Sequence, residues 1–219
     1  MYFQIIFLSI AVTSLVAFLV ASIANYNNKY NRKYSVLNTF PYELNFDAPF
    51  KENLIGNLLL ILSSIMLMTF YAFLWSKFMN GFMILLMVSG IIASILPIFL
   101  VLVPVTHLKS HLIVDTLSFA FTFTNVGAVF VLAFFDFREN DNIGSFIMVF
   151  ISGFFLLLYV FILLNPKLSK WGNADKVKNA DGTMTYVRPK FFPLAYTEWL
   201  SILFVYLAAF LAFAQFIIL

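Results

Sequence analysis

Two histidines and an aspartate share one short stretch of the chain, THLKSHLIVD at 106–115. His107, His111 and Asp115 follow one another at intervals of four residues. Residues four apart lie on the same face of an α-helix. Two imidazoles and a carboxylate on one face could bind a metal ion or exchange protons with a substrate. This stretch is therefore the first candidate for chemistry.

The polar pattern continues into the apolar run that follows. With residues placed at about 100° intervals, six polar side chains fall within roughly 80° of one another. They are His107, His111, Asp115, Ser118, Thr122 and Asn125. Polar groups within a bilayer are costly unless they find partners, so this polar stripe is expected to face the interior of a helix bundle.

Two hypotheses explain the stripe. In the first, the stripe lines a polar cavity together with Glu198, at the start of the sixth apolar run, and Asn57, near the start of the second. His107, His111, Asp115 and Glu198 then hold a metal ion in that cavity. In the second, the histidines lie at the lipid headgroups and the deeper hydroxyls and amide are interhelical hydrogen bonds, worth about 1 kcal/mol each. The second is favoured, because HxxxH without the glutamate of HExxH is a weak metal signal.

Composition places these residues in a membrane. Hydrophobic residues make up 63% of the 219 and charged residues only 11%, against about 25% charged in soluble domains. A soluble fold of this size cannot bury so much apolar surface, so an integral membrane protein is expected. The absence of cysteine excludes disulfides and thiolate metal sites. No cofactor is expected, and the net charge of +3 is too small to indicate nucleic acid binding.

Six apolar runs are long enough to cross about 30 Å of hydrocarbon. They lie near 2–25, 54–75, 82–105, 112–135, 145–164 and 199–219. The first is too long for a signal peptide and lacks a basic start, so it is expected to be a retained span. The prediction is an all-α protein, with residues 1–219 forming a single polytopic domain, a compact bundle of six transmembrane helices.

The basic residues predict an orientation. Eleven of the thirteen lie on the first, third and fifth loops: Lys29, Arg32, Lys33, Lys51, Lys109, Lys167, Lys170, Lys176, Lys178, Arg188 and Lys190. By the positive-inside rule these loops, which include 26–53 and 165–198, face the cytoplasm and both termini face outward. A bacterial cytoplasmic membrane is expected, with an organellar inner membrane as the alternative.

The two long loops carry local patterns. In KVKNADGTMTYVRP, Asp181 and Gly182 separate two polar, β-prone pieces, which predicts a small hairpin between the fifth and sixth helices. In the first loop, the aromatic and acidic stretch FPYELNFDAPF at 40–50 is expected to lie along the membrane interface as a belt.

Rows of small residues predict close helix contacts. The third helix has Gly90 and Ser94, and the sixth has a row of Ser201, Val205, Ala208, Ala209 and Ala212. The first helix has the row Ser9, Thr13, Ala17 and Ala21. Ala17→Leu is therefore expected to destabilise the bundle or an oligomer, and Ala11→Leu, off that row, to be mild. Pro97 and Pro104 should kink or end the third helix.

These features favour a non-enzymatic membrane protein. It would bind a lipid or small hydrophobic molecule through its polar cavity, or serve as a subunit of a membrane complex. Expected partners are membrane lipids and, through the small-residue rows, another membrane protein or a second copy of the chain. One alternative is a small-molecule transporter or channel, which needs a continuous polar path. The other is a metal-dependent intramembrane hydrolase using His107, His111 and Asp115.

Overall fold

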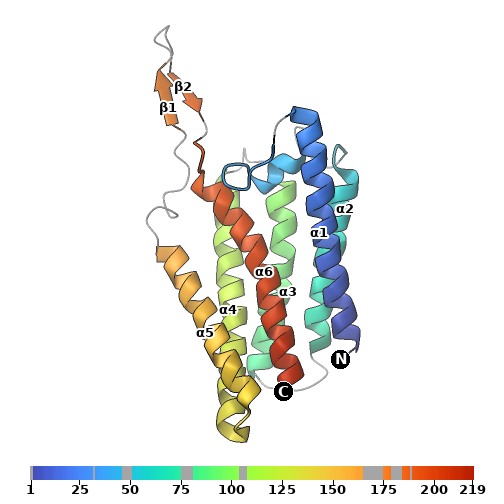
Figure 1. Cartoon of the computed structure of the whole chain (residues 1–219), viewed down its shortest axis with the longest axis vertical. Helices are drawn as coiled ribbons and strands as arrows, with labels where there is room; N and C mark the ends of the chain where they lie inside the picture. The colour runs from blue at the N-terminus through green and yellow to red at the C-terminus, as the bar shows by residue number, and fades with distance from the viewer. Residues whose placement is uncertain are drawn as a thin grey trace.

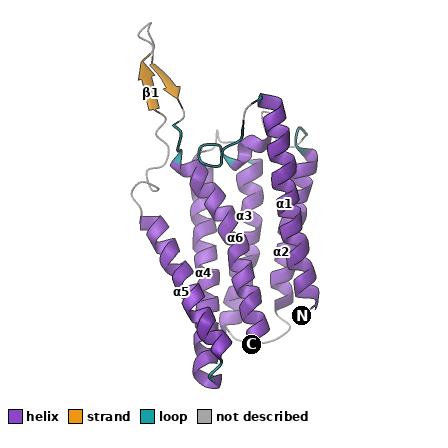
Figure 2. Ribbon diagram, in the orientation of Figure 1, coloured by secondary structure: helices purple, strands orange, loops and turns teal. Residues whose placement is uncertain are grey.

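Six long helices dominate the chain. A computed structural model describes residues 2–31, 33–45, 51–74, 81–103, 108–164, 175–178, 184–187 and 189–219. The helices are α1 (Tyr2–Tyr30), α2 (Leu54–Phe73), α3 (Gly81–Leu102), α4 (Leu108–Asn140), α5 (Ile143–Leu164) and α6 (Pro193–Ile218). Each is long and apolar enough to cross a membrane. The predicted α-helical bundle of six membrane-spanning helices is confirmed (Figures 1 and 2).

Several helices extend past the predicted apolar runs. The 33 residues of α4 correspond to about 50 Å at 1.5 Å per residue, well beyond about 30 Å of hydrocarbon. Its last turns carry Asp136 and Arg138, beyond the expected limit near residue 135. The sixth helix begins at Pro193 rather than near Trp199, and proline suits the first turn of a helix. Apolarity predicts the part of a helix in lipid and misses its polar ends.

The helices differ in how much of each faces protein. Consecutive helices from α1 to α5 pack against one another, and α6 packs mainly against α4 and α3. Of the apolar window of α6, 56% is buried, whereas only 22% of that of α5 is buried. Figure 1 shows α5 at the edge of the bundle, leaning away from it toward the end where the hairpin lies. The sixth helix is therefore central and α5 peripheral.

The small-residue rows of α3 and α6 are internal contacts, as predicted. A Cβ added to Gly90 would lie 2.3 Å from the ring of Tyr71 on α2. Ser94 is buried and donates its hydroxyl hydrogen bond to the Gly90 carbonyl. Ser201, Val205, Ala208, Ala209 and Ala212 of α6 are all buried. Only a residue without a side chain at position 90 lets α2 and α3 approach this closely.

The small-residue row on α1 does not face the inside of the bundle, so an internal contact there is ruled out, and a contact with a partner chain stays a prediction. Ser9 and Thr13 are exposed, and Ala17 and Ala21 are half-buried. The buried face instead carries Gln4, Leu8, Ala11, Ser14, Phe18, Ser22 and Tyr26. Large side chains on this face fill the space between helices, so a search for small residues alone selects the wrong face.

The predicted hairpin is present between α5 and α6. Strand β1 (Asp175–Lys178) pairs antiparallel with β2 (Met184–Val187), with Lys178 opposite Met184. The expected turn at Asp181 and Gly182 lies outside the described residues. The end of α1, the start of α2 and the start of α6 lie at one end of the bundle, and the two termini lie at the other (Figure 1).

The third helix tolerates one proline and stops before the other. It continues through Pro97 and ends at Leu102, two residues before Pro104, which cannot donate the next helical hydrogen bond. The last carbonyls of a helix have no intrahelical donor. One of them, at Val103, becomes part of the site described below.

Candidate functional site

The polar stripe of α4 faces the interior of the bundle. His111, Asp115, Ser118, Thr122 and Asn125 are each 0% exposed. His107, the first member predicted, lies outside the described residues. Leu108 begins the helix, so His111 lies in its first turn and Asp115 about 6 Å deeper at 1.5 Å per residue. The titratable part of the stripe is thus near one end of the bundle.

His111 forms a buried pair with Glu198 of α6. Its Nδ1 lies 2.9 Å from Glu198 Oε1, and its Nε2 lies 2.8 Å from the carbonyl oxygen of Val103. Because that carbonyl only accepts, Nε2 carries a proton. One further proton must then lie between Nδ1 and Oε1, on either the imidazole or the carboxyl group. The pair is electrically neutral in both arrangements.

The hydrogen bonds of His111 compete with its predicted role as a metal ligand. Both ring nitrogens of His111 are in use, so binding a metal through either would break a hydrogen bond to Val103 or Glu198. The described residues contain no group of three or more histidine and acidic side chains placed to hold a metal ion. His107 lies outside them, and the four-ligand site with Asp115 stays a prediction.

Asp115 lies beside the same turns of α6. Thr197, Glu198 and Ser201 are its neighbours on that helix. The Thr197 hydroxyl donates to the Leu194 carbonyl at 3.0 Å, and the Ser201 hydroxyl donates to the Glu198 carbonyl at 2.9 Å. Both hydroxyls also lie within reach of Asp115, and each has one proton to give, either to that backbone carbonyl or to the carboxyl group. Neither carboxyl oxygen of Asp115 has a hydrogen-bond partner among the described residues.

Two more buried oxygens belong to residues near Asp115, one on α4 and one on α6. Within the described part of the chain, Glu198 Oε2 and the hydroxyl of Ser118, one turn along α4 from Asp115, also have no hydrogen-bond partner. Buried polar atoms of native proteins are nearly always satisfied, so each exception needs an explanation. We call Asp115, Ser118, Thr197, Glu198 and Ser201 the oxygen cluster.

Of the deeper members of the stripe, Asn125 makes the interhelical hydrogen bonds of the second hypothesis, whereas Thr122 bonds within α4. Thr122 donates to the Ser118 carbonyl at 2.7 Å. Asn125 donates to the Leu86 carbonyl of α3 at 2.7 Å and accepts from the Tyr71 hydroxyl of α2 at 3.3 Å. Asn125 therefore ties three helices together near the middle of the bundle.

The inward face of α4 becomes apolar beyond Asn125. Val126, Val129 and Ala133 are buried there, and the next inward polar group is Asp136 near the other end. That carboxylate accepts hydrogen bonds from Asn140, Asn142 and Ser145, which satisfy it at the helix corner. Along α4, polar side chains cross only part of the bundle.

A segment of the first loop covers the His111 end of the site. Residues 33–45, which we call the cap segment, include the 3-10 helix η1 (Pro41–Asn45). The ring of Phe40 meets that of His111 edge-on, with 6.5 Å between centroids. Phe40 and Leu44 are buried, so this half of the predicted interfacial belt instead packs into the bundle end. Residues 46–50 lie outside the described part.

Hydrogen bonds hold the cap segment to α6. Trp199 Nε1 donates to the Tyr34 hydroxyl at 3.1 Å and to the Thr39 carbonyl at 3.0 Å. Burial raises the pKa of Tyr34 well above its ordinary value. Its hydroxyl therefore stays protonated and donates to the Phe40 carbonyl at 2.8 Å. These contacts close the site from the side of the loop.

Sequence reasoning brought together His111, Asp115 and Glu198 and missed their surroundings. The Val103 carbonyl could have been suspected from Pro104, which ends α3 and leaves carbonyls without donors. Thr197 and Ser201 flank Glu198 at helical spacing. Asn57 is buried on α2, which packs mainly against α1 and α3. Glu52 pairs with Lys29 on the surface.

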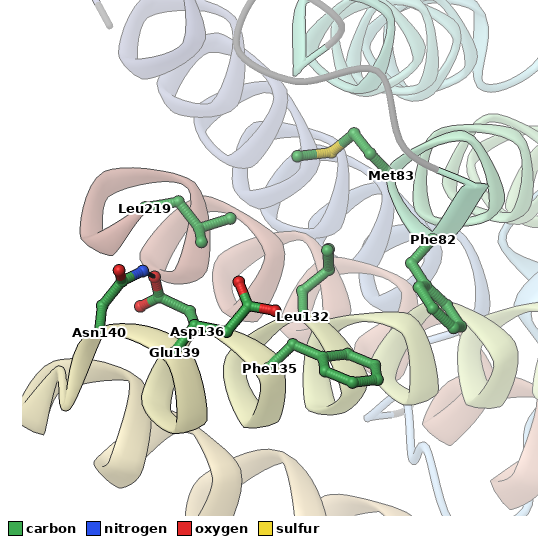
Figure 3. Close-up of a pocket in the computed structure, with 8 residues that line it drawn as sticks. All are labelled: Phe82, Met83, Leu132, Phe135, Asp136, Glu139, Asn140 and Leu219. Carbon is green, nitrogen blue, oxygen red and sulfur yellow. Dashed lines mark hydrogen bonds between the residues drawn. The ribbon is translucent and has the colours of Figure 1, made fainter.

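Three cavities lie away from the oxygen cluster, and one of them, of about 360 Å³, is between α1 and α6. Another, of about 320 Å³, is at the opposite end, with Asp136, Glu139 and Asn140 on one side and Phe82 and Met83 of α3 on the other (Figure 3). A larger groove of about 600 Å³ lies between α4 and α5. It is lined by Phe123, Phe130, Val149, Phe150, Gly153, Phe154, Leu156, Leu157 and Val160.

The chain was compared with protein-family models, with characterised proteins and with solved structures, and nothing matches in any of the three comparisons.

Proposed function

We propose that this integral membrane protein is a non-enzymatic lipid-binding protein, which holds one acyl chain in the groove between α4 and α5. The observation that carries the proposal is the lining of that groove, which is apolar throughout. The groove exists because α5 is peripheral and because Gly153 presents no side chain toward Phe130. A Cβ added to Gly153 would lie 3.4 Å from that ring.

The dimensions of the groove favour an acyl chain. Its lining on α5 runs from Val149 to Val160, about 16 Å along a helix at 1.5 Å per residue. Half of a hydrocarbon core of about 30 Å is about 15 Å, the depth that the chains of one leaflet occupy. Phe150, Phe154 and Leu157 of α5 stand exposed along the groove, and Phe123 and Phe130 line its α4 side, so a chain lying there contacts apolar side chains of both helices.

The rival functions have less support. A transporter or channel needs a polar path across the bundle, and the polar stripe of α4 gives way to Val126, Val129 and Ala133. A metal-dependent hydrolase needs His111 as a ligand, and both its ring nitrogens are engaged.

Filling the groove should remove the lipid. In Gly153→Leu the new side chain points toward Phe130 and occupies the space of an acyl chain. We expect the native protein to retain about one lipid per chain after exchange into mild detergent, and the variant to retain at least fivefold less. Native mass spectrometry measures the lipid bound per chain.

Gly127→Leu on α4 is the matched control. A Cβ at Gly127 meets no described atom within 4 Å, and Gly127 does not line the groove. This variant should retain lipid as the native chain does. Equal retention by both variants, or a native dimer that only Gly153→Leu dissociates, would mean that the groove does not hold a lipid chain.

We further propose that the protein lies in a bacterial cytoplasmic membrane with its hairpin in the cytoplasm. The support is the eleven basic residues on the odd loops. Single cysteines placed at Asn173 and Asn140 should react with a membrane-impermeant maleimide from opposite sides, Asn173 from the cytoplasm. The chain has no cysteine of its own, so each label reports one site. Labelling of both positions from the same side would rule out this orientation.

A further inference from the structure

We propose that the oxygen cluster binds one monovalent alkali-metal cation, held chiefly by the carboxylate of Asp115. This site is separate from the lipid groove, since none of its five residues lines that groove. The proposal starts from the unsatisfied oxygens. Asp115 is 0% exposed and neither of its oxygens has a hydrogen-bond partner among the described residues.

The donor set consists of hard oxygens. Besides the two of Asp115, Glu198 Oε2 and the Ser118 hydroxyl are buried without a partner in the described part of the chain. The hydroxyls of Thr197 and Ser201 lie beside Asp115. When they donate to the backbone carbonyls of Leu194 and Glu198, their oxygen lone pairs are available to a cation bound by Asp115. Carboxylate and hydroxyl oxygens suit hard cations, whereas transition metals prefer imidazole or thiolate.

The net charge of the cluster favours a monovalent cation over a divalent one. His111 and Glu198 share one proton and are neutral as a pair, because the Val103 carbonyl fixes the proton on Nε2. An ionised Asp115 then leaves one uncompensated negative charge in a buried site, which is very costly. One monovalent cation cancels it, whereas a divalent cation would leave an excess positive charge.

The surroundings explain how such an ion would be held. The cluster lies near the end of the bundle where α4 and α6 begin, so an ion has a short path from water. The cap segment then covers the site through Phe40 and the hydrogen bonds of Trp199. Glu43 of the cap segment is close enough for its charge to act on Glu198, and it accepts a hydrogen bond from the Phe40 amide at 2.7 Å.

Thermal unfolding of the full-length protein in detergent tests the proposal. At constant pH and ionic strength, choline chloride is replaced stepwise by NaCl and, separately, by KCl. A ligand that binds only the folded state raises Tm, by roughly 5–10 °C at about one hundred times its Kd for a chain of this size. We expect a saturable rise with at least one of the two ions, which identifies the ion, and one bound ²²Na⁺ or ⁸⁶Rb⁺ per chain.

Two variants should lose the response. Asp115→Asn keeps the shape and removes the charge, so the rise should disappear. Ser201→Ala removes one hydroxyl and should weaken the apparent affinity about tenfold, which keeps the test open if the first variant folds poorly. Asp141→Asn, an exposed carboxylate at the other end of the bundle, should respond as the native chain does.

Three results would contradict the proposal. If Tm is the same in sodium, potassium and choline, or if Asp115→Asn responds like the native protein, the cluster does not bind an alkali cation. A larger rise with calcium than with either monovalent ion would overturn the charge argument.

Discussion

Glu198→Ala should lower the free energy of unfolding by about 3–5 kcal/mol, the range for removing one partner of a buried charged pair. The substitution leaves Nδ1 of His111 without the carboxyl oxygen that lies 2.9 Å away, in a site where both side chains are fully buried. For a chain of this size the loss corresponds to roughly 10 °C in Tm. Thermal unfolding in detergent, followed by circular dichroism, measures it.

Two further variants separate this pair from a general effect of losing a glutamate. Glu52→Ala removes the same side chain from the surface pair with Lys29, and should cost less than about 1 kcal/mol. Glu198→Gln should recover most of the loss, because its amide can donate to Nδ1 of a neutral His111. If Glu198→Ala and Glu52→Ala lowered the free energy of unfolding by similar amounts, the buried pair would contribute no more stability than the surface pair.

Long apolar runs and polar periodicity were the parts of the structure that could be predicted. Six runs gave six helices, because lipid forces every backbone hydrogen bond inside the segment. The stripe from His111 to Asn125 faces inward for an equally simple reason, since its groups need partners. Glu198 could be assigned to the same end as Asp115 because successive spans alternate direction.

The rest depends on contacts that no local pattern encodes. Which face of α1 is buried depends on how its side chains fit those of α2. That the cap segment folds over His111 depends on Trp199, far away in sequence. The engagement of both ring nitrogens of His111 depends on the carbonyl of Val103, directly after α3, and on a carboxyl group of α6. Each is a tertiary contact between helices whose separate patterns say only that they cross the membrane.

The first helix offers the clearest test of such contacts. Ala11 is fully buried, and the hydroxyl of Ser63 on α2 donates a hydrogen bond to its carbonyl. Ala11→Leu forces a larger side chain into this contact and should destabilise the protein by about 1–3 kcal/mol, the usual cost of overpacking. The change in Tm in detergent, where a partner chain is diluted away, measures the cost.

Ala17→Leu is the matched control, because it makes the same change on the same helix. Ala17 is half-buried, and Ser9 and Thr13 of its row are exposed, so the new side chain can extend toward lipid. Its effect in detergent should stay within about 0.5 kcal/mol, as for most surface substitutions. If Ala17→Leu instead proved the more damaging of the two, the small-residue row would be the packed face of α1. The packing of α1 against α2 through Ala11 and Ser63 would then be incorrect.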